Sequence, residues 1–329
     1  MLACIFKLFG LACTLVFSCL FFEQKGYAEN YLKKESSLAP IPASEQNLQT
    51  VFAEEWLTLP DVHGVEGPVF EQDGKLLLSD LSGKRILRIS KNKEISTLFH
   101  RNDISLGGLA IDQTGHIIIA SLDIAQNKGA ILSLDHEGKN LKILIPVSAG
   151  LLPNDVVFDR LGGLYISDFR GNATDPSGGI YYLPPEKKNA VSVFPHLAMA
   201  NGIAISPNGK EVWVTEFARN ILYRLTLSDP THVIPLDTNA VYYFTGAAPD
   251  STRTDKNGNI YVAIYGQGRV LVFSPQGIAF AQILLPRRDE GHNLRTTSMA
   301  INKESNEIFI VTSDDKDNNS RIFKSKIPL

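Results

Sequence analysis

The stretch Asp250–Phe273, with the sequence DSTRTDKNGNIYVAIYGQGRVLVF, decides the fold. It consists of a polar head, a short strand, a Lys-Asn-Gly turn ending at Gly258, a Tyr/Val/Ile strand, a glycine loop and a third strand. Asn and Gly both tolerate positive φ, so a turn of this kind between two β-type runs predicts a hairpin. We therefore expect the strands on either side of Gly258 to pair antiparallel.

The same unit recurs along the chain. Stepping back eight residues from each hairpin turn, the last of them a degenerate copy aligned on Asn306, gives six heads: Glu66, Gly107, Asn154, Asn201, Asp250 and Ser298. Successive heads are 41 to 49 residues apart, and each turn is followed by an apolar strand. A period in the forties with three to four strands per period is typical of propeller blades. We predict an all-β fold, a six-bladed β-propeller.

The last repeat leaves its blade one strand short. It supplies three strands before the chain ends at Leu329, whereas the other repeats contain a recognisable fourth strand, at residues 94–99, 141–145, 190–194, 241–244 and 278–285. Residues 51–59 have a strand-like sequence. We predict that this N-terminal strand pairs with the last blade and closes the ring, which removes an open sheet edge.

The N-terminal region differs in composition from the repeats. Residues 1–28 read as a signal peptide, with Lys7, an apolar run over 8–22 and a small-x-small cleavage pattern at 26–28. A lipoprotein with an acylated Cys19 is the minor alternative. Residues 29–50 are polar, contain two prolines and predict a flexible tether before a propeller domain over 51–329. We expect an exported protein, periplasmic or secreted, with no membrane span in the mature chain.

Composition excludes several classes of function. The 329 residues carry a formal charge of −3 and no run of Lys or Arg, so we expect no nucleic-acid partner. Cys4, Cys13 and Cys19 all lie in the predicted signal peptide. The mature chain therefore has no thiol for a disulfide, a nucleophile or a Cys-based metal site. The sequence gives no indication of oligomeric state.

Blades repeat radially, so the six heads should form one ring at one mouth of the central channel. Glu66, Asn154, Asn201 and Asp250 offer two carboxylates and two amide oxygens, a set that suits Ca²⁺ better than Zn²⁺. Taken singly, each has an ordinary explanation, because Asn often caps a local turn and acids are common in loops. Asp155 and Ser251 adjoin ring positions, and strand alternation predicts that they point outward. Acidic or imidazole groups at the same face are expected to be structural rather than catalytic: Asp80, Asp168, Glu216 and His292.

Several strings at and around these positions are similar to a known family. Glu66-Gly67-Pro68, Pro153-Asn154-Asp155, Asn201-Gly202-Ile203-Ala204 and Pro249-Asp250-Ser251 resemble the metal-site motifs of the gluconolactonase and senescence-marker family of six-bladed propellers. Longer strings resemble its bacterial drug-responsive lactonases: Ser167–Gly171, Tyr242–Gly246, Tyr265–Phe273 and Arg288–Thr297.

This resemblance implies a calcium-dependent lactone hydrolase, with a small lactone or ester as substrate. It places one central calcium on Glu66, Asn154, Asn201, Asp250 and Ser251, and it gives Asp250 the proton-transfer role. Leu152 stands where sugar-lactone members have an arginine, which argues against a sugar lactone. Residues 145–148 have no carboxylate, which argues against the second, surface calcium of the drug-responsive lactonases.

Two rival functions stay open on the sequence. One is a non-catalytic periplasmic propeller that binds a ligand and uses calcium only to brace its channel. The other is a phosphotriesterase-type hydrolase that uses the same calcium on phosphorus centres.

Overall fold

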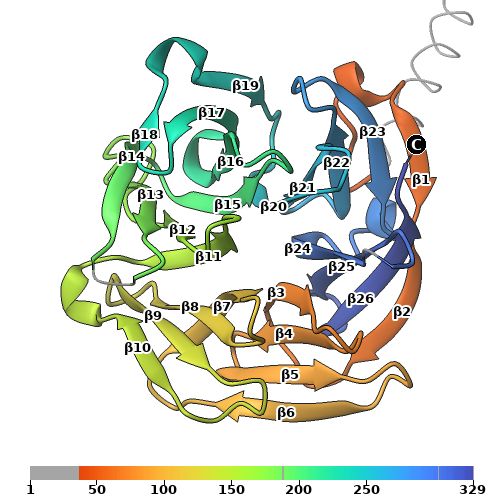
Figure 1. Cartoon of the computed structure of the whole chain (residues 1–329). Coiled ribbons are helices and arrows are strands. Elements are labelled where there is room, and N and C mark those ends of the chain that lie inside the picture. The colour runs from red at the N-terminus through yellow and green to blue at the C-terminus, as the bar shows by residue number, and fades with distance from the viewer. Residues whose placement is uncertain (1–36, 187–188, 303, 329) are drawn as a thin grey trace, which may run out of the picture.

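Six sheets stand around a central axis in the computed structural model (Figure 1), which describes residues 37–186, 189–302 and 304–328. All their strand pairs are antiparallel except the one between β1 (Gln49–Phe52) and β23 (Ala279–Leu284). Blade one comprises β3 (Val65–Phe70), β4 (Leu76–Asp80), β5 (Arg85–Ile89) and β6 (Ile95–His100). Blade two comprises β7 (Ser105–Ile111), β8 (Ile117–Asp123), β9 (Lys128–Leu134) and β10 (Lys142–Ile145). Blade three comprises β11 (Pro153–Phe158), β12 (Leu164–Asp168), β13 (Gly178–Leu183) and β14 (Val191–Leu197).

The remaining blades carry additional or borrowed strands. Blade four comprises β15 (Ala200–Ile205), β16 (Glu211–Glu216) and β17 (Ile221–Asp229), with β18 (His232–Val233) and β19 (Asn239–Tyr243) both paired to β17. Blade five comprises β20 (Pro249–Thr254), β21 (Ile260–Ile264), β22 (Arg269–Phe273), β23 (Ala279–Leu284) and β1 (Gln49–Phe52). Blade six comprises β24 (Arg295–Asn302), β25 (Glu307–Asp314), β26 (Asn319–Lys326) and β2 (Glu54–Leu59). Short 3₁₀ helices lie in the connections: η1 (Ala43–Glu45), η2 (Val147–Ala149), η3 (Phe217–Arg219), η4 (Pro235–Asp237) and η5 (Arg288–Glu290).

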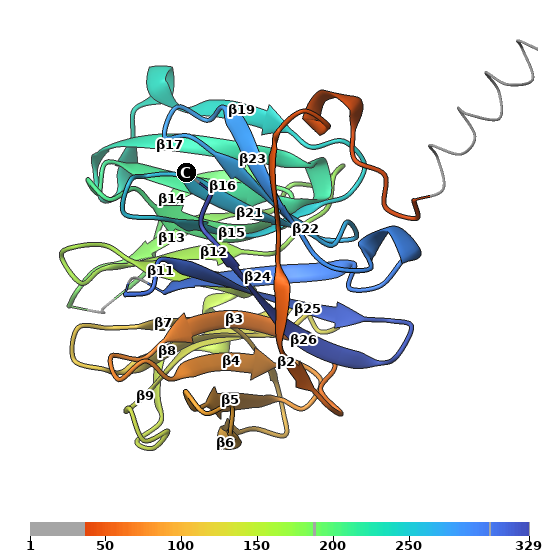
Figure 2. The ribbon, with the colours of Figure 1, turned by 90° about the vertical axis from the view of Figure 1, so that its right-hand side faces the viewer.

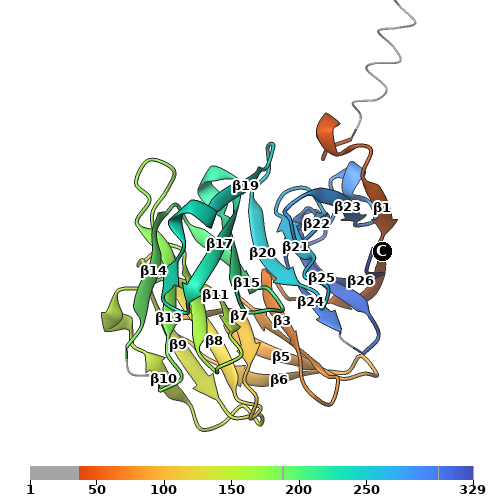
Figure 3. The same cartoon turned by 45° about the horizontal axis from the view of Figure 1, so that its top comes forward.

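The ring closes as the sequence predicted. β2 pairs antiparallel with β26, from Glu54 opposite Lys324 to Leu59 opposite Ser320, and so supplies the outer strand of the last blade. The innermost strands β3, β7, β11, β15, β20 and β24 contact one another in sequence around the axis (Figure 3). Each blade therefore contributes the residues of its first strand to one shared channel.

Apolar side chains fill the seams between neighbouring blades. Six buried clusters each join two adjacent blades. In the seam between blades one and two, for example, Leu77 and Ile86 pack with Leu109 and Ile119. Alternating strand positions face the two neighbours, so each sheet is apolar on both sides and reads as a nearly continuous hydrophobic run. Packing at these seams fixes the positions of the innermost strands around the axis.

The segment before β2 differs from the expected tether. Residues 37–52, which we call the N-terminal strap, run along the outer side of the molecule (Figure 2), and β1 pairs parallel with β23 of blade five. Glu45 of the strap is buried and forms an ion pair with the buried Arg269. The prediction of a flexible tether is therefore wrong for residues 37–50. The physical reason is that Arg269, inside blade five, requires a buried anion, which the strap supplies.

The predicted signal peptide and the alternative lipid attachment at Cys19 lie outside the described residues. Within the part of the chain that the structure describes, no helix combines the length and the apolar character needed to cross a bilayer.

Candidate metal centre

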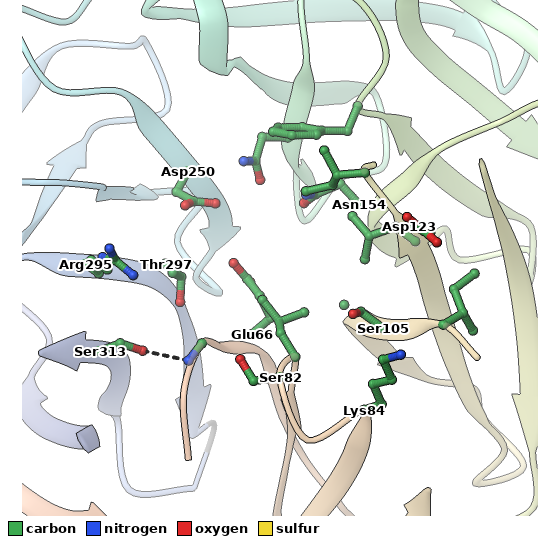
Figure 4. A pocket seen from close by; sticks show the side chains of 18 of the residues that line it. Glu66, Ser82, Lys84, Ser105, Asp123, Asn154, Asp250, Arg295, Thr297 and Ser313 are labelled. Carbon is green, nitrogen blue, oxygen red and sulfur yellow. Dashed lines mark hydrogen bonds between the residues drawn. The ribbon is translucent and has the colours of Figure 1, made fainter. Parts of the chain in front are cut away.

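A cavity of about 580 Å³ opens at one mouth of the central channel (Figure 4). All six innermost strands reach it, β7 and β24 with an additional residue each, Ser105 and Arg295. At the level of the repeat heads it is lined by Glu66 of β3, Gly107 of β7, Asn154 of β11, Asn201 of β15, Asp250 of β20 and Thr297 of β24. The structure thus brings Glu66, Asn154, Asn201 and Asp250 together at one face, as the repeat alignment predicted. We call these six residues the polar ring.

The sixth position of the ring differs from the sequence alignment. Thr297 lines the cavity, whereas the predicted Ser298 lies fully buried outside the cavity lining. Asn302 pairs with Glu307 across the last hairpin, while Thr254 pairs with Ile260 in the preceding blade, so the last hairpin loop is one residue shorter. The alignment on Asn306 was therefore out of step by one residue in this blade.

Every innermost strand carries an irregularity at the level of the ring. In blade five, Pro249 pairs with Ile264 but the next pair is Thr252 with Val262, so the inner strand holds one extra residue there. The same shift occurs in the other five blades. A bulge of this kind breaks the alternation of side chains and re-aims them. Two successive residues of one strand can therefore both face the channel.

This bulge explains why Ser251 and Asp155 are buried, although both were predicted to point outward. Ser251 does not line the cavity, but it is buried and lies close enough to Glu66 to lower the pKa of that carboxyl. Asp155, expected to point outward, is 1% exposed and forms an ion pair with Arg253 inside the channel. Regular alternation is not a valid guide where each first strand contains a bulge.

Glycine at the bulge allows neighbouring inner strands to approach closely. A Cβ on Gly202 would lie 2.3 Å from the backbone nitrogen of Thr252 in the next blade. A Cβ on Gly67, which has a φ of +55°, would lie 2.6 Å from the backbone nitrogen of Leu109. No side chain fits at either position, and Gly67 also uses the left-handed conformation that glycine adopts readily. These glycines set how tightly the polar ring can close.

Burial and mutual repulsion perturb the two acidic residues of the ring. Burial, and next the negative charge of Asp155, raises the pKa of Glu66 to about 8. Burial, and next the negative charge of Glu66, raises the pKa of Asp250 well above its ordinary value. Two carboxylates in a water-poor channel destabilise each other's charged form. A positive charge placed between them would remove that penalty.

The ring also contains acceptor atoms without donors. Among the described residues, neither Asn201 Oδ1 nor Asp250 Oδ1 accepts a hydrogen bond, although both are buried. Glu66 Oε2 accepts a 3.3 Å bond from the backbone of Gly67. Buried polar atoms normally find partners, and unpaired ones indicate an ion or water that belongs there. Carboxylate, amide and hydroxyl oxygens are the donors that Ca²⁺ prefers, so the residues present fit such an ion.

The acids at the ends of the second strands have structural partners. Asp80 accepts a 2.8 Å bond from Arg85 Nε, and Asp168 accepts bonds from Arg170 and from the backbone of Leu152. Glu216 accepts a 2.7 Å bond from the backbone nitrogen of Ala198. His292 contacts Asp314 at 2.7 Å. These contacts hold the loops of the cavity face in place, and the structural role expected for the four groups stays a prediction.

A second ring above the polar one was missed from the sequence. In each blade a residue at or just beyond the end of the second strand lines the cavity, and most of the six are apolar: Leu81, Leu122, Phe169, Phe217, Tyr265 and Ser313. The ring centroids of Phe169 and Phe217 are 5.8 Å apart, and those of Phe217 and Tyr265 are 6.0 Å apart. The signal was present, since these residues stand at similar positions near the end of the second strand in every repeat. We call this set the apolar ring.

Comparison with known proteins now places the chain. Residues 65–314 match the family model described as "SMP-30/Gluconolactonase/LRE-like region". The chain belongs to this family. It is 38% identical to a protein named lactonase drp35 from Staphylococcus saprophyticus over 302 residues, which cover 90% of this chain and 93% of that protein. The Staphylococcus aureus protein of the same name is also 38% identical, over 86% of this chain and 89% of its own length.

Solved structures of this family share its fold. A calcium-binding protein named regucalcin from Agrobacterium tumefaciens superimposes with a TM-score of 0.69 at 20% identity, covering 85% of this chain and 95% of its own. A gluconolactonase from Xanthomonas campestris gives a TM-score of 0.66 at 20% identity, covering 81% of this chain and 87% of its own. At this level of identity the likeness confirms the six-bladed propeller and says nothing further about the chain's activity.

Proposed function

We propose that the chain is a calcium-dependent lactonase, a carboxylic ester hydrolase with its ion in the central channel. Glu66, Asn154, Asn201, Asp250 and Ser251 would hold one calcium ion. The observation that carries this proposal is the pair of buried oxygens, on Asn201 and Asp250, that face one cavity without a donor among the described residues. The names of the relatives, lactonase drp35 and calcium-binding regucalcin, support it.

The chemistry divides between the ion and the residues around it. When bound, calcium supplies a Lewis acid that polarises a lactone carbonyl and offsets the negative charge that develops on its oxygen. Asp250 lies in the polar ring beside the cavity, where its carboxylate can take a proton from an attacking water and return it to the leaving oxygen. The apolar ring holds the body of the lactone and reduces the access of bulk water to the reacting bond.

Residue chemistry supports attack by water rather than by a protein nucleophile. The sequence contains no Gly-x-Ser-x-Gly elbow, and its three cysteines lie at positions 4, 13 and 19, ahead of the propeller. Export to the periplasm or beyond is part of the proposal and rests on the signal-like residues 1–28. The apolar ring favours a lactone with apolar substituents over a polyhydroxylated sugar lactone.

The experiment that tests this proposal compares three substrates on one preparation. Turnover of a γ-lactone, an aryl ester and an organophosphate is measured before chelation, after EDTA treatment and after calcium is restored. Glu66→Gln and Asp250→Ala are measured alongside, and Glu54→Gln, at an exposed position on the outer strand, is the matched control. We expect lactone hydrolysis that disappears with EDTA or either channel variant and returns with calcium in the wild type and the control.

Each rival function predicts a different result. Tight calcium binding without turnover of any of the three substrates would indicate a binding propeller, and preference for the organophosphate would indicate a phosphotriesterase. Lactone turnover that survives EDTA and both channel variants would contradict the proposal.

A further inference from the structure

An ion pair between a buried carboxylate and a partly buried guanidinium lies next to the polar ring. Arg253 Nη1 contacts Asp155 Oδ2 at 2.6 Å, and Arg253 Nη2 contacts Asp155 Oδ1 at 3.3 Å, so the guanidinium grips the carboxylate with two nitrogens. Asp155 Oδ1 also accepts a 2.9 Å bond from the backbone nitrogen of Val156. The side chain of Asp155 is 2% exposed and that of Arg253 is 18% exposed. Two-point contacts of this kind fix the orientation of both groups.

The pair connects the level of the polar ring with a second cavity. Asp155 follows the ring residue Asn154 in β11, and its Oδ2 accepts a 3.5 Å bond from the backbone nitrogen of Ile203, two residues after the ring residue Asn201. Arg253 lines a separate cavity of about 730 Å³, together with Val156 and hairpin residues such as Gly74 and Pro207. The polar ring faces the cavity at the other mouth. The pair therefore lies between the two cavities and forms the floor of the candidate metal centre.

The charged groups at this floor carry a net charge that matches a divalent cation. Glu66, Asp155 and Asp250 are three buried carboxylates, and Arg253 is the partly buried cation paired with one of them. With all four groups charged, the net charge is −2, equal and opposite to that of one divalent ion. Without Arg253 it would be −3, a better match for a trivalent ion. Charges in a poorly solvated channel interact strongly over several ångströms, so a change of one unit should alter ion affinity substantially.

We propose that Arg253 is a positioning residue that binds Asp155 and thereby sets the charge of the channel for a divalent cation. This inference rests on the proposed function, because it presupposes that the polar ring binds an ion. Arg253 contacts Asp155 and acts on the ion through it. The Asp155–Arg253 pair determines which ion charge the polar ring accepts, while the ring supplies the ligand oxygens.

A series of charge-neutralising substitutions on the full chain tests this role. Dissociation constants for Ca²⁺ and Tb³⁺ are measured by titration calorimetry on metal-free wild type, Arg253→Met, Asp155→Asn and the double variant. Arg160→Met is the matched control, because Arg160 also lines the cavity of about 730 Å³ and its side chain is exposed. Thermal unfolding of each variant without metal shows whether the propeller still folds.

The expected pattern follows from the charge count. Arg253→Met should bind Ca²⁺ at least tenfold more tightly and should gain more for Tb³⁺ than for Ca²⁺, whereas Asp155→Asn should bind Ca²⁺ at least tenfold more weakly. The double variant restores a net charge of −2 and should return to within about threefold of wild type. Arg160→Met should change neither constant.

Other outcomes separate the inference from the proposed function. If wild type binds no Ca²⁺, the proposed metal centre itself is wrong. If wild type binds Ca²⁺ and Arg253→Met leaves both constants unchanged, or the double variant stays as weak as Asp155→Asn, the role assigned to Arg253 is wrong. If Arg253→Met does not fold, the comparison of the double variant with Asp155→Asn gives the same answer, because both retain a neutral residue at position 155.

Discussion

Two regions of this propeller bury a carboxylate to nearly the same depth and treat it in opposite ways. Glu45 of the N-terminal strap is 2% exposed, and Asp250 of the polar ring is 4% exposed. Glu45 forms an ion pair with Arg269 and accepts a 2.6 Å bond from the Tyr242 hydroxyl. Asp250 lies near a second acid, Glu66, and its Oδ1 accepts no bond from the described residues.

The difference shows that burial alone does not distinguish a functional acid from a structural one. A buried carboxylate with a cation and a hydroxyl donor around it is part of the packing. Carboxylates that repel each other beside open acceptor atoms indicate a charge that must come from a ligand. The comparison assigns the strap to stability and the polar ring to chemistry, and the following experiments test that assignment.

The largest expected effect comes from removing the charge of Asp250. Asp250→Asn should lower kcat/KM for a lactone by three orders of magnitude or more, because it removes both a proposed ligand charge and the proton acceptor. The fold should persist, since the change also removes repulsion with Glu66. Steady-state kinetics and thermal unfolding in EDTA measure the two quantities. A tenfold loss or less would place Asp250 with the structural acids.

The next largest effect comes from the matching change in the strap. Glu45→Ala leaves Arg269 buried without its anion and should lower the free energy of unfolding by about 3–5 kcal/mol. Kinetic constants of the surviving folded protein should stay near wild type. Glu54→Ala is the control, since the Glu54–Lys324 pair is 3.3 Å long and largely exposed, and it should cost less than about 1 kcal/mol. Urea unfolding measures both, and equal losses would remove the contrast between buried and exposed pairs.

A smaller effect should appear in the pH dependence of the metal-free protein. The pKa of Glu66 is raised from 4.5 to about 8, so the folded state keeps a proton that the unfolded state releases. Stability should therefore fall as pH rises between these two values and level off above the higher one. In EDTA, raising the pH from 4.5 to about 8 should lower the Tm of the wild type by roughly 5 °C more than the Tm of Glu66→Gln. Calcium should abolish the difference, and identical pH profiles without metal would contradict the assignment.

The smallest effect is expected at the apolar ring. Phe217→Ala should raise KM for an apolar lactone by about tenfold and change kcat by less than about threefold, because it removes packing against bound substrate rather than a reacting group. Tyr243→Ala, at an exposed position on the outer strand of blade four, is the matched control. A loss confined to kcat would instead assign Phe217 to the chemistry of the polar ring.

The sequence predicted the fold well because its signals are local and repeated. Each blade carries its own hairpin turn and its own apolar strands, so six weak signals reinforce one another. The fourth strands and the closure of the last blade by β2 follow from counting strands in each repeat. The strap was missed because its pairing partner β23 lies far along the chain and residues 29–50 have no apolar period.

The polar ring was predicted in part. Glu66, Asn154, Asn201 and Asp250 occur at one repeat position, and the structure brings them to one cavity, whereas their roles as ligands remain a proposal. The orientation of Asp155 was predicted wrongly because the bulge in β11 cannot be recognised from the local sequence. The sixth ring position was assigned to Ser298 instead of Thr297 because the last hairpin loop is one residue shorter. Both errors concern backbone geometry that side-chain periodicity does not encode.

The pairing of β2 with β26 has a consequence for how this molecule assembles. Leu59 leaves the ribosome long before its partner Ser320 is made, so blade six cannot form until β26 has been synthesised. Long-range pairing of this kind makes the final step of folding slow. Until that step, β2 and β25 expose unpaired strand edges, which invite association with other copies. A chain interrupted before β26 would thus leave β2 without a partner and β25 with a free edge at the same time.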